Sequence, residues 1–303
     1  FCFMMQGLFA GLLMESFTKK KWGIYGAVVL FVCSPILVER AFRHTALASQ
    51  WLILAALYLY FQSKKSGKLP WGFLALQVLC VGLHPYFVPM VCGILAAWTL
   101  ERLCKGKEGE WKRTAAFFMG NLAVVLLAGY GIGVFGSGVS GTAGGFGYYS
   151  MNLNALWNPV SIGVESWSAL LPGLSQTAGN YDGFNYLGMG VLLFGAFGLG
   201  RLAVGLVREK RLREFLGQYR GLLLFLGFCV LFAWSNVITL NGTTLFTIPL
   251  PEKVQELCSV FRASGRMFWP VYELLFLLAC LTAIRLPKRI GIGAMAVLLT
   301  LQL

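Results

Sequence analysis

Long runs of apolar residues, separated by short polar segments, extend from one end of this chain to the other. A helix needs about 20 apolar residues to cross the hydrocarbon core of a bilayer. The pattern therefore predicts an all-α fold, a polytopic bundle of transmembrane helices that forms one domain over residues 1–303. The predicted spans are residues 1–15, 22–38, 45–61, 71–100, 114–135, 186–207, 220–240, 268–285 and 290–303.

The composition agrees with a membrane protein. Only 12% of the residues are charged, against about a quarter in soluble domains. The net charge is +13, but the positive residues cluster between apolar runs, as membrane insertion produces, so we expect no nucleic-acid partner. Phe1 and Leu303 both lie inside apolar runs. We therefore expect a fragment of a longer protein that is truncated within a span at each end.

The basic residues predict which loops share one side of the membrane. Cytoplasmic loops are enriched in Lys and Arg, so the basic clusters should all face the cytoplasm. A single span over 71–100 would put the later clusters outside. The five clusters hold 20 of the 25 basic residues: Lys19–Lys21; Lys64, Lys65 and Lys68; Arg102, Lys105, Lys107, Lys112 and Arg113; Arg201, Arg208, Lys210, Arg211, Arg213 and Arg220; Arg285, Lys288 and Arg289.

A break at His84-Pro85 solves this problem. The proline removes a backbone donor and disfavours helix at the residue before it. Residues 71–83 and 86–100 then form two short helices joined by an external turn, and all five clusters face the cytoplasm. These short helices must tilt, thin the bilayer or be re-entrant. The long extracytoplasmic segments are then about 35–45, 136–185 and 241–267.

Four ionisable residues gather between Glu39 and His44 at the outer end of a predicted hairpin. Polar residues at membrane depth are costly and become functional candidates. Arg40 and Arg43 are candidates to bind a lipid phosphate, and His44 is a weak candidate for acid–base catalysis, as is His84. The alternative is an interfacial turn in which Glu39 pairs with an arginine. No histidine spacing typical of zinc occurs, so we expect no structural metal.

Aromatic rings and side-chain amides dominate the long segment 136–185. Such residues suit a sugar, because rings stack on its apolar faces and amides bond its hydroxyls; they also occur in interfacial aromatic belts. Asp182 is the only aspartate, so a pair of aspartates cannot come from this chain. It is a further weak catalytic candidate. The candidates for sugar or acceptor contact are Tyr148, Tyr149, Asn152, Tyr181, Asp182 and Asn185.

The segment Pro251–Arg266 predicts an amphipathic helix along the external interface. Its apolar residues from Val254 to Phe261 follow helical spacing. Arg262 and Arg266 are four residues apart and share one face of this helix. They are candidates to bind a lipid phosphate, and the alternative is contact with ordinary anionic headgroups.

The chain resembles the GT-C superfamily, membrane glycosyltransferases that use polyprenyl-phosphate-linked sugars. More closely, it resembles a family of bacterial multispanning proteins of unknown function with a GT-C-like fold. GT-C enzymes place a catalytic acidic residue in the first external loop, which we expect in a missing N-terminal part; Asp182 lies in a much later loop. The stretches that carry the resemblance are Ser34-Pro35 through Arg40 to His44 and Trp51, His84-Pro85-Tyr86, Gly147-Tyr148-Tyr149-Ser150-Met151-Asn152-Leu153, Tyr181-Asp182-Gly183-Phe184-Asn185-Tyr186-Leu187-Gly188 and Phe261-Arg262-Ala263-Ser264-Gly265-Arg266-Met267-Phe268-Trp269-Pro270.

The resemblance implies an enzyme of the bacterial inner (cytoplasmic) membrane with an extracytoplasmic functional face. It would transfer a sugar from a polyprenyl-phosphate carrier to a glycan or other envelope acceptor. Its expected partners are membrane lipids and the lipid-linked sugar; no cofactor is evident, and the sequence offers no support for a divalent metal. Two alternatives stay open. A transporter or flippase needs polar residues inside the bilayer, where Gln77 and Glu273 are among few; the other is a non-catalytic membrane protein on the same fold.

Overall fold

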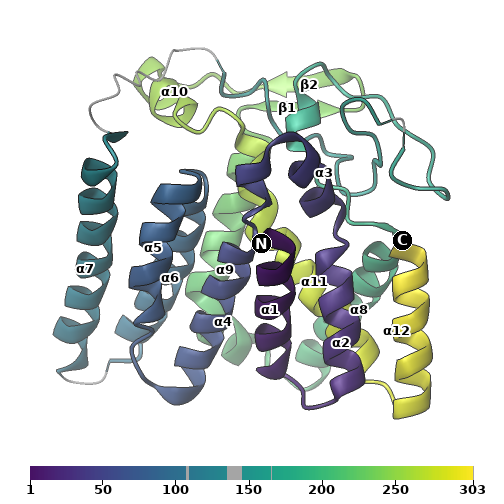
Figure 1. Ribbon diagram of the computed structural model, residues 1–303, viewed down its shortest axis with the longest axis horizontal. Helices are drawn as coiled ribbons and strands as arrows, with labels where there is room; N and C mark the ends of the chain where they lie inside the picture. The colour runs from purple at the N-terminus through teal and green to yellow at the C-terminus, as the bar shows by residue number, and fades with distance from the viewer. Residues whose placement is uncertain (107–108, 135–144, 165, 303) are drawn as a thin grey trace.

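The computed structural model describes residues 1–106, 109–134, 145–164 and 166–302. Its helices stand side by side in a bundle, and loops, short helices and a small hairpin cover one end (Figure 1). The predicted helical class is confirmed. The elements are α1 (Cys2–Glu15), α2 (Lys21–Val32), α3 (Pro35–Arg43), α4 (Trp51–Ser66), α5 (Gly72–Leu83), α6 (Phe87–Leu103), α7 (Glu110–Gly131), α8 (Met189–Arg208), α9 (Leu212–Trp234), β1 (Val237–Leu240), β2 (Thr243–Thr247), α10 (Glu252–Ser259), α11 (Trp269–Ile284) and α12 (Lys288–Gln302).

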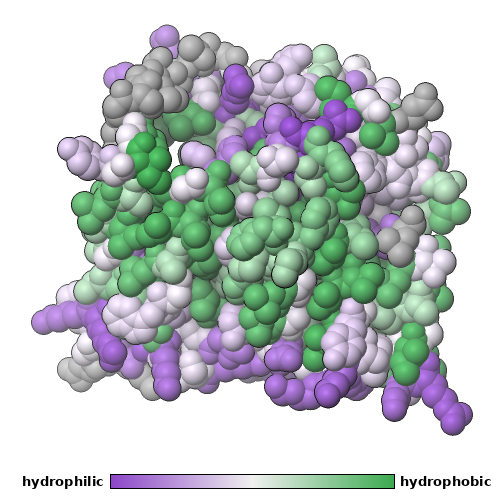
Figure 2. All heavy atoms as spheres, viewed as in Figure 1, coloured by the Kyte–Doolittle hydropathy of each residue, from purple (hydrophilic) through white to green (hydrophobic). Residues whose placement is uncertain are grey.

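Several helices are suited to a lipid environment. Within the described residues, four are long and apolar enough to cross a membrane: α7, α8, α9 and the stretch Ser264–Ile284 that includes α11. A fifth is added if the bent pair α2 and α3 counts as one span. Apolar side chains such as Leu127, Phe197 and Leu231 are more than half exposed on the outer helices. Figure 2 shows the result, a hydrophobic belt between two polar ends, which is the pattern that a bilayer stabilises.

The break at His84-Pro85 lies between two helices, as predicted. α5 ends at Leu83 and α6 begins at Phe87, and the two pack against each other. His84 has an extended backbone, with φ −163° and ψ 126°. This conformation is the one that a following proline favours.

The basic loops meet at one end of the bundle. Lys20 Nζ donates to the carbonyl of Ile284 at 2.6 Å, and Lys64 Nζ donates to the carbonyl of Gln218 at 2.6 Å. These contacts join ends of helices that are far apart in the sequence. The opposite end carries α3, α10 and the β1–β2 hairpin (Figure 1). The separation of the two ends agrees with the charge pattern. Below, we call them the basic end and the loop-covered end.

The predicted span 22–38 is not one continuous helix. α2 ends at Val32, and α3 begins at Pro35 with a bend of 41° between them. Proline fits the first turn of a helix, where its missing N–H is not needed, but it breaks a helix that arrives from before it. The segment 35–45 is therefore mostly helix rather than a turn, and the span predicted at 45–61 is a helix from Trp51 to Ser66.

Two further boundaries were predicted wrongly near the loop-covered end. The predicted span 220–240 stops at Trp234, because Ser235 turns the backbone to φ 61°. The chain then forms β1 and β2, an antiparallel pair, so the fold is not strictly all-α. The amphipathic helix predicted over Pro251–Arg266 is confined to α10, and a separate 3-10 helix follows it at Ser264–Phe268.

α11 is the central helix of the bundle. It packs on α2, α4, α8, α9 and α12. Its large side chains Trp269, Tyr272 and Phe276 are almost completely buried. Because α11 follows the 3-10 helix Ser264–Phe268 directly, its burial fixes the position of Arg266 at the loop-covered end.

Candidate functional site

Asp182 lies at the centre of the polar groups in the loop-covered end. Its carboxylate accepts Arg40 Nη1 at 2.8 Å and Arg266 Nη2 at 2.6 Å. Arg266 binds it bidentately, through Nε and Nη2, and Arg40 Nη2 also donates to the Asp182 backbone carbonyl at 2.9 Å. All three residues are at most 9% exposed. The only aspartate of the chain thus joins two arginines that are 226 residues apart in sequence.

A second ion pair lies beside the first on α3. Arg43 Nε contacts the Glu39 carboxylate at 2.6 Å, as the alternative interpretation of this segment predicted. Glu39 is buried and also accepts the Ser161 hydroxyl at 3.1 Å. Asp182 is the ion-pair partner of both Arg40 and Arg266, so these three buried residues carry a net charge of +1, while the exposed Arg43 is paired with Glu39. A buried charge without a counter-ion is costly, so this group favours the approach of an anion.

Two glycines allow the segments that carry Asp182 and Arg266 to touch. A Cβ at Gly265 would lie 2.5 Å from the Gly183 Cα, and a Cβ at Gly183 would lie 2.3 Å from the Ser150 carbonyl oxygen. Asn185 locks the contact by donating to the carbonyls of Gly183 and Gly265, both at 3.0 Å. Its side-chain nitrogen is thus committed to the protein, although its Oδ1 has no partner.

His84 and Tyr86 place an aromatic wall beside Arg266. The Arg266 guanidinium lies over the Tyr86 ring, 4.9 Å from its centroid, and the Tyr86 hydroxyl accepts the Ala263 N–H at 2.8 Å. Tyr86 belongs to a motif that the sequence analysis singled out, but this role was not predicted.

The electrostatics of the cluster appear in the pKa values of two groups. Burial, together with the nearby charges of Arg266 and His44, lowers the pKa of His84 to about 4. His84 is therefore neutral at pH 7, and because Nδ1 accepts the Tyr86 N–H at 3.3 Å, its proton lies on Nε2. For Asp182, burial raises the pKa, but the neighbouring Arg40 and Arg266 charges outweigh it, so the net pKa lies below its ordinary value.

A more open aromatic surface lies next to the cluster. Tyr149 packs edge-on against Tyr148 at 4.8 Å and against Tyr181 at 5.9 Å between ring centroids. The Arg262 guanidinium lies 5.6 Å from the Tyr149 ring. Arg262 is exposed and has no ion pair within the described ranges. Within these ranges its guanidinium is accessible and unpaired, whereas the exposed Arg43 is paired with Glu39.

Asn152 has a different environment from the tyrosines. It is 1% exposed. Its amide nitrogen donates to Asn180 Oδ1 at 3.0 Å and to the Asn241 carbonyl at 2.8 Å, while its oxygen accepts the N–H groups of Asn154 and Asn241. All of these bonds are internal to the protein. In this structure Asn152 holds the long loop against the β1–β2 turn.

The structure thus brings most of the predicted site residues to one end but gives them different positions. Arg40, Arg266 and Asp182 form the buried cluster, while His44 is exposed at the end of α3. Part of the segment 136–185 falls outside the described residues. Among those that are described, no group of three or more His, Cys, Asp or Glu side chains is placed to hold a metal ion.

Fold and site together define a helical membrane protein with a polar, arginine-rich, loop-covered end. The chain belongs to a family described as a domain of unknown function (DUF6311), whose model matches residues 1–303. No curated protein matches the chain significantly. No solved structure matches it either.

Proposed function

We propose that the loop-covered end binds a polyprenyl-phosphate-linked sugar and serves its transfer to an envelope acceptor at the extracytoplasmic face of a bacterial cytoplasmic membrane. The observation that carries the proposal is the uncompensated positive charge of the buried cluster. Arg40 and Arg266 share the Asp182 carboxylate, and Arg262 stands beside them with an exposed guanidinium. Guanidinium groups bind phosphate through charge-assisted hydrogen bonds.

Each group has a distinct part in this proposal. Arg262 contacts the phosphate directly, because its guanidinium is free to approach a ligand. Arg40 and Arg266 supply the positive potential behind it. Neutral His84 offers its Nε2–H as a hydrogen-bond donor without adding charge. The rings of Tyr148 and Tyr149 supply flat surfaces on which the apolar face of a sugar can stack.

Glycosyl transfer breaks the bond between the anomeric carbon and the phosphate oxygen, and the acceptor oxygen takes that position on carbon. Negative charge develops on the departing phosphate, which the arginines stabilise. A base must accept the proton of the acceptor. Asp182 and Glu39 are both held by arginines. Because both carboxylates are engaged in ion pairs, we assign to these residues and their neighbours the binding of phosphate and sugar.

Binding of a prenyl phosphate to the purified, detergent-solubilised chain tests the proposal. We expect Arg262→Gln to weaken binding about tenfold, the loss of one charge-assisted contact. Lys253→Gln is the matched control, because Lys253 is an exposed cation in α10 at the same end. It should leave the affinity unchanged. Transfer of radiolabelled sugar from the polyprenyl carrier to envelope membranes gives the second readout.

Equal affinities for the wild type, Arg262→Gln and Lys253→Gln would refute the assignment of the phosphate site. Tight binding of the lipid-linked sugar with movement across vesicles and no transfer would favour the transporter alternative instead.

A further inference from the structure

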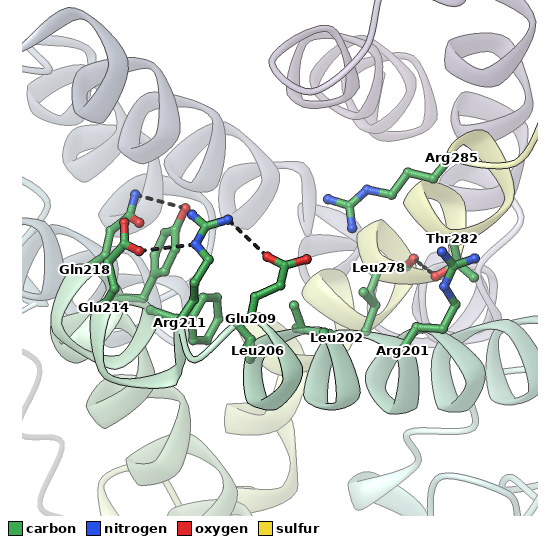
Figure 3. Close-up of a pocket in the computed structure, with 14 residues that line it drawn as sticks. Arg201, Leu202, Leu206, Glu209, Arg211, Glu214, Gln218, Leu278, Thr282 and Arg285 are labelled. Carbon is green, nitrogen blue, oxygen red and sulfur yellow. Dashed lines mark hydrogen bonds and ion pairs between the residues drawn. The ribbon is translucent and has the colours of Figure 1, made fainter.

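A cavity lies at the basic end of the bundle, opposite to Asp182. It has a volume of about 450 Å³, is lined by α8, α9 and α11, and opens to the surface. Its walls combine apolar side chains, such as Leu202 and Leu278, with charged groups (Figure 3). Gly205 contributes to the space, because a Cβ there would meet nothing within 4 Å.

α9 is interrupted where it borders this cavity. Tyr219 lies inside the helix with φ −116° and ψ 18°, outside the helical range. The first turns of α9, which carry Glu214 and Gln218 into the cavity wall, therefore do not continue the line of the long apolar part. This kink separates the first turns of α9, which line the cavity, from the long apolar part of the helix.

The charges in the cavity are unbalanced. Arg211 pairs with Glu209 at 3.5 Å and with Glu214 at 3.2 Å, so both carboxylates are engaged. Arg201 and Arg285 have no carboxylate within 4 Å in the described part of the chain. The three arginines and two glutamates leave a net charge of +1.

The two unpaired arginines come from different helices. Figure 3 shows Arg285 extending from the end of α11 over α8, while Arg201 rises from α8 beside Thr282. The Thr282 hydroxyl donates to the Leu278 carbonyl at 2.8 Å and keeps its acceptor capacity. Two guanidiniums that are unpaired within the described residues and line one cavity together with apolar side chains match a ligand with an anionic group attached to hydrocarbon.

We infer that this cavity binds the phosphate of an anionic phospholipid in the leaflet at the basic end. Arg201 and Arg285 contact the phosphodiester oxygens, and an acyl chain follows Leu202 and the exposed apolar face of α8. Basic pockets between transmembrane helices bind anionic headgroups in this way. The site is separate from the loop-covered end and does not depend on the function proposed for it.

Lipid binding to the purified full chain, measured by native mass spectrometry in a neutral detergent, tests this inference. Phosphatidylglycerol, phosphatidylcholine and inorganic phosphate are added in separate arms. We expect phosphatidylglycerol to bind about tenfold more tightly than phosphatidylcholine. Arg201→Gln combined with Arg285→Gln should abolish this preference. Arg213→Gln is the control, because Arg213 is exposed at the same end but does not line the cavity.

Three results would overturn the inference: no preference for phosphatidylglycerol in the wild type, an equal loss in Arg213→Gln, or occupation of the site by inorganic phosphate alone at equal affinity. The preference for phosphatidylglycerol is measured on the wild type. It therefore tests the inference even if the double variant fails to fold. Arg201→Lys with Arg285→Lys retains the charge and should keep part of the preference. Prenyl phosphate binding that depends on Arg262 should be unchanged in the double variant.

Discussion

At Asp182, one carboxylate balances two buried guanidiniums, so this residue controls more than its own hydrogen bonds. Replacing it with asparagine leaves Arg40 and Arg266 buried without a counter-ion. Breaking a buried pair in this way costs about 3–5 kcal/mol. We therefore expect Asp182→Asn to lower the free energy of unfolding by about that amount at pH 7, as measured by thermal unfolding in detergent. Lys253→Gln should be neutral in the same measurement.

The pH dependence of this effect follows from the lowered pKa of Asp182. A carboxyl with a depressed folded pKa stabilises the fold fully above its unfolded pKa, about 3.9. That contribution is lost as the pH falls through the lower folded pKa. The difference in the free energy of unfolding between the wild type and Asp182→Asn should therefore be constant from pH 5 to 7 and decrease below about pH 4. A gap that widened on acidification would contradict the ion-pair account.

The pairing of these residues could be predicted only in part from the sequence. The Glu39–Arg43 pair is local, four residues apart on one helix, and helical spacing indicates it directly. The pairing of Asp182 with Arg40 and Arg266 is not local. It depends on close contacts at Gly183 and Gly265, between the 3-10 helices Asn180–Gly183 and Ser264–Phe268, which no periodicity reveals.

At the scale of elements, charge was more informative than hydropathy. Hydropathy alone does not divide the apolar run 71–100, yet the distribution of basic residues required a break, Pro85 indicated its place, and α5 and α6 are separate there. The break at Pro35 changes no loop from one side to the other, so charge could not locate it. The hairpin after α9 was missed because β1 continues an apolar run.

Three helices are joined at the basic end by a buried carboxylate. Glu101 on α6 accepts the Tyr60 hydroxyl at 2.7 Å and Lys64 Nζ at 2.6 Å, both from α4, and the Leu222 N–H of α9 at 3.0 Å. Glu101→Gln leaves the partly buried Lys64 without its counter-ion and replaces a carboxylate that is 3% exposed. We expect a loss of about 3–5 kcal/mol in the free energy of unfolding, measured by denaturant titration in detergent.

Glu110 provides the matched control for this prediction. Its pair with Arg102 spans 3.3 Å, and its side chain is 45% exposed. Glu110→Gln should cost less than about 1 kcal/mol, because water screens such pairs. Equal decreases in the free energy of unfolding for the two variants would show that the contacts of Glu101 do not stabilise the packing of the three helices.

At the scale of the whole molecule, the two polar ends differ in chemistry. Excess basic residues gather at the end where Lys20 contacts Ile284, whereas the loop-covered end holds the aromatic residues and the Asp182 cluster. The positive-inside rule predicts that the first faces the cytoplasm. The phosphate site proposed near Arg262 and the lipid cavity near Arg285 then face opposite leaflets, so one orientation determines which lipids each can reach.

Labelling of cysteines in spheroplasts tests this orientation. Cys104 is exposed in the connection between α6 and α7 at the basic end, and Lys253 is exposed in α10 at the other end. In Lys253→Cys, a membrane-impermeant maleimide should modify position 253 in intact spheroplasts, whereas Cys104 should react only after permeabilisation. Peptide mass mapping separates the two sites and the half-buried Cys258, and Cys104→Ser confirms the assignment. Modification of Cys104 in intact spheroplasts would show that the basic end faces outward. Because the two ends lie on opposite sides of one bundle, both proposed sites would then face the opposite compartments.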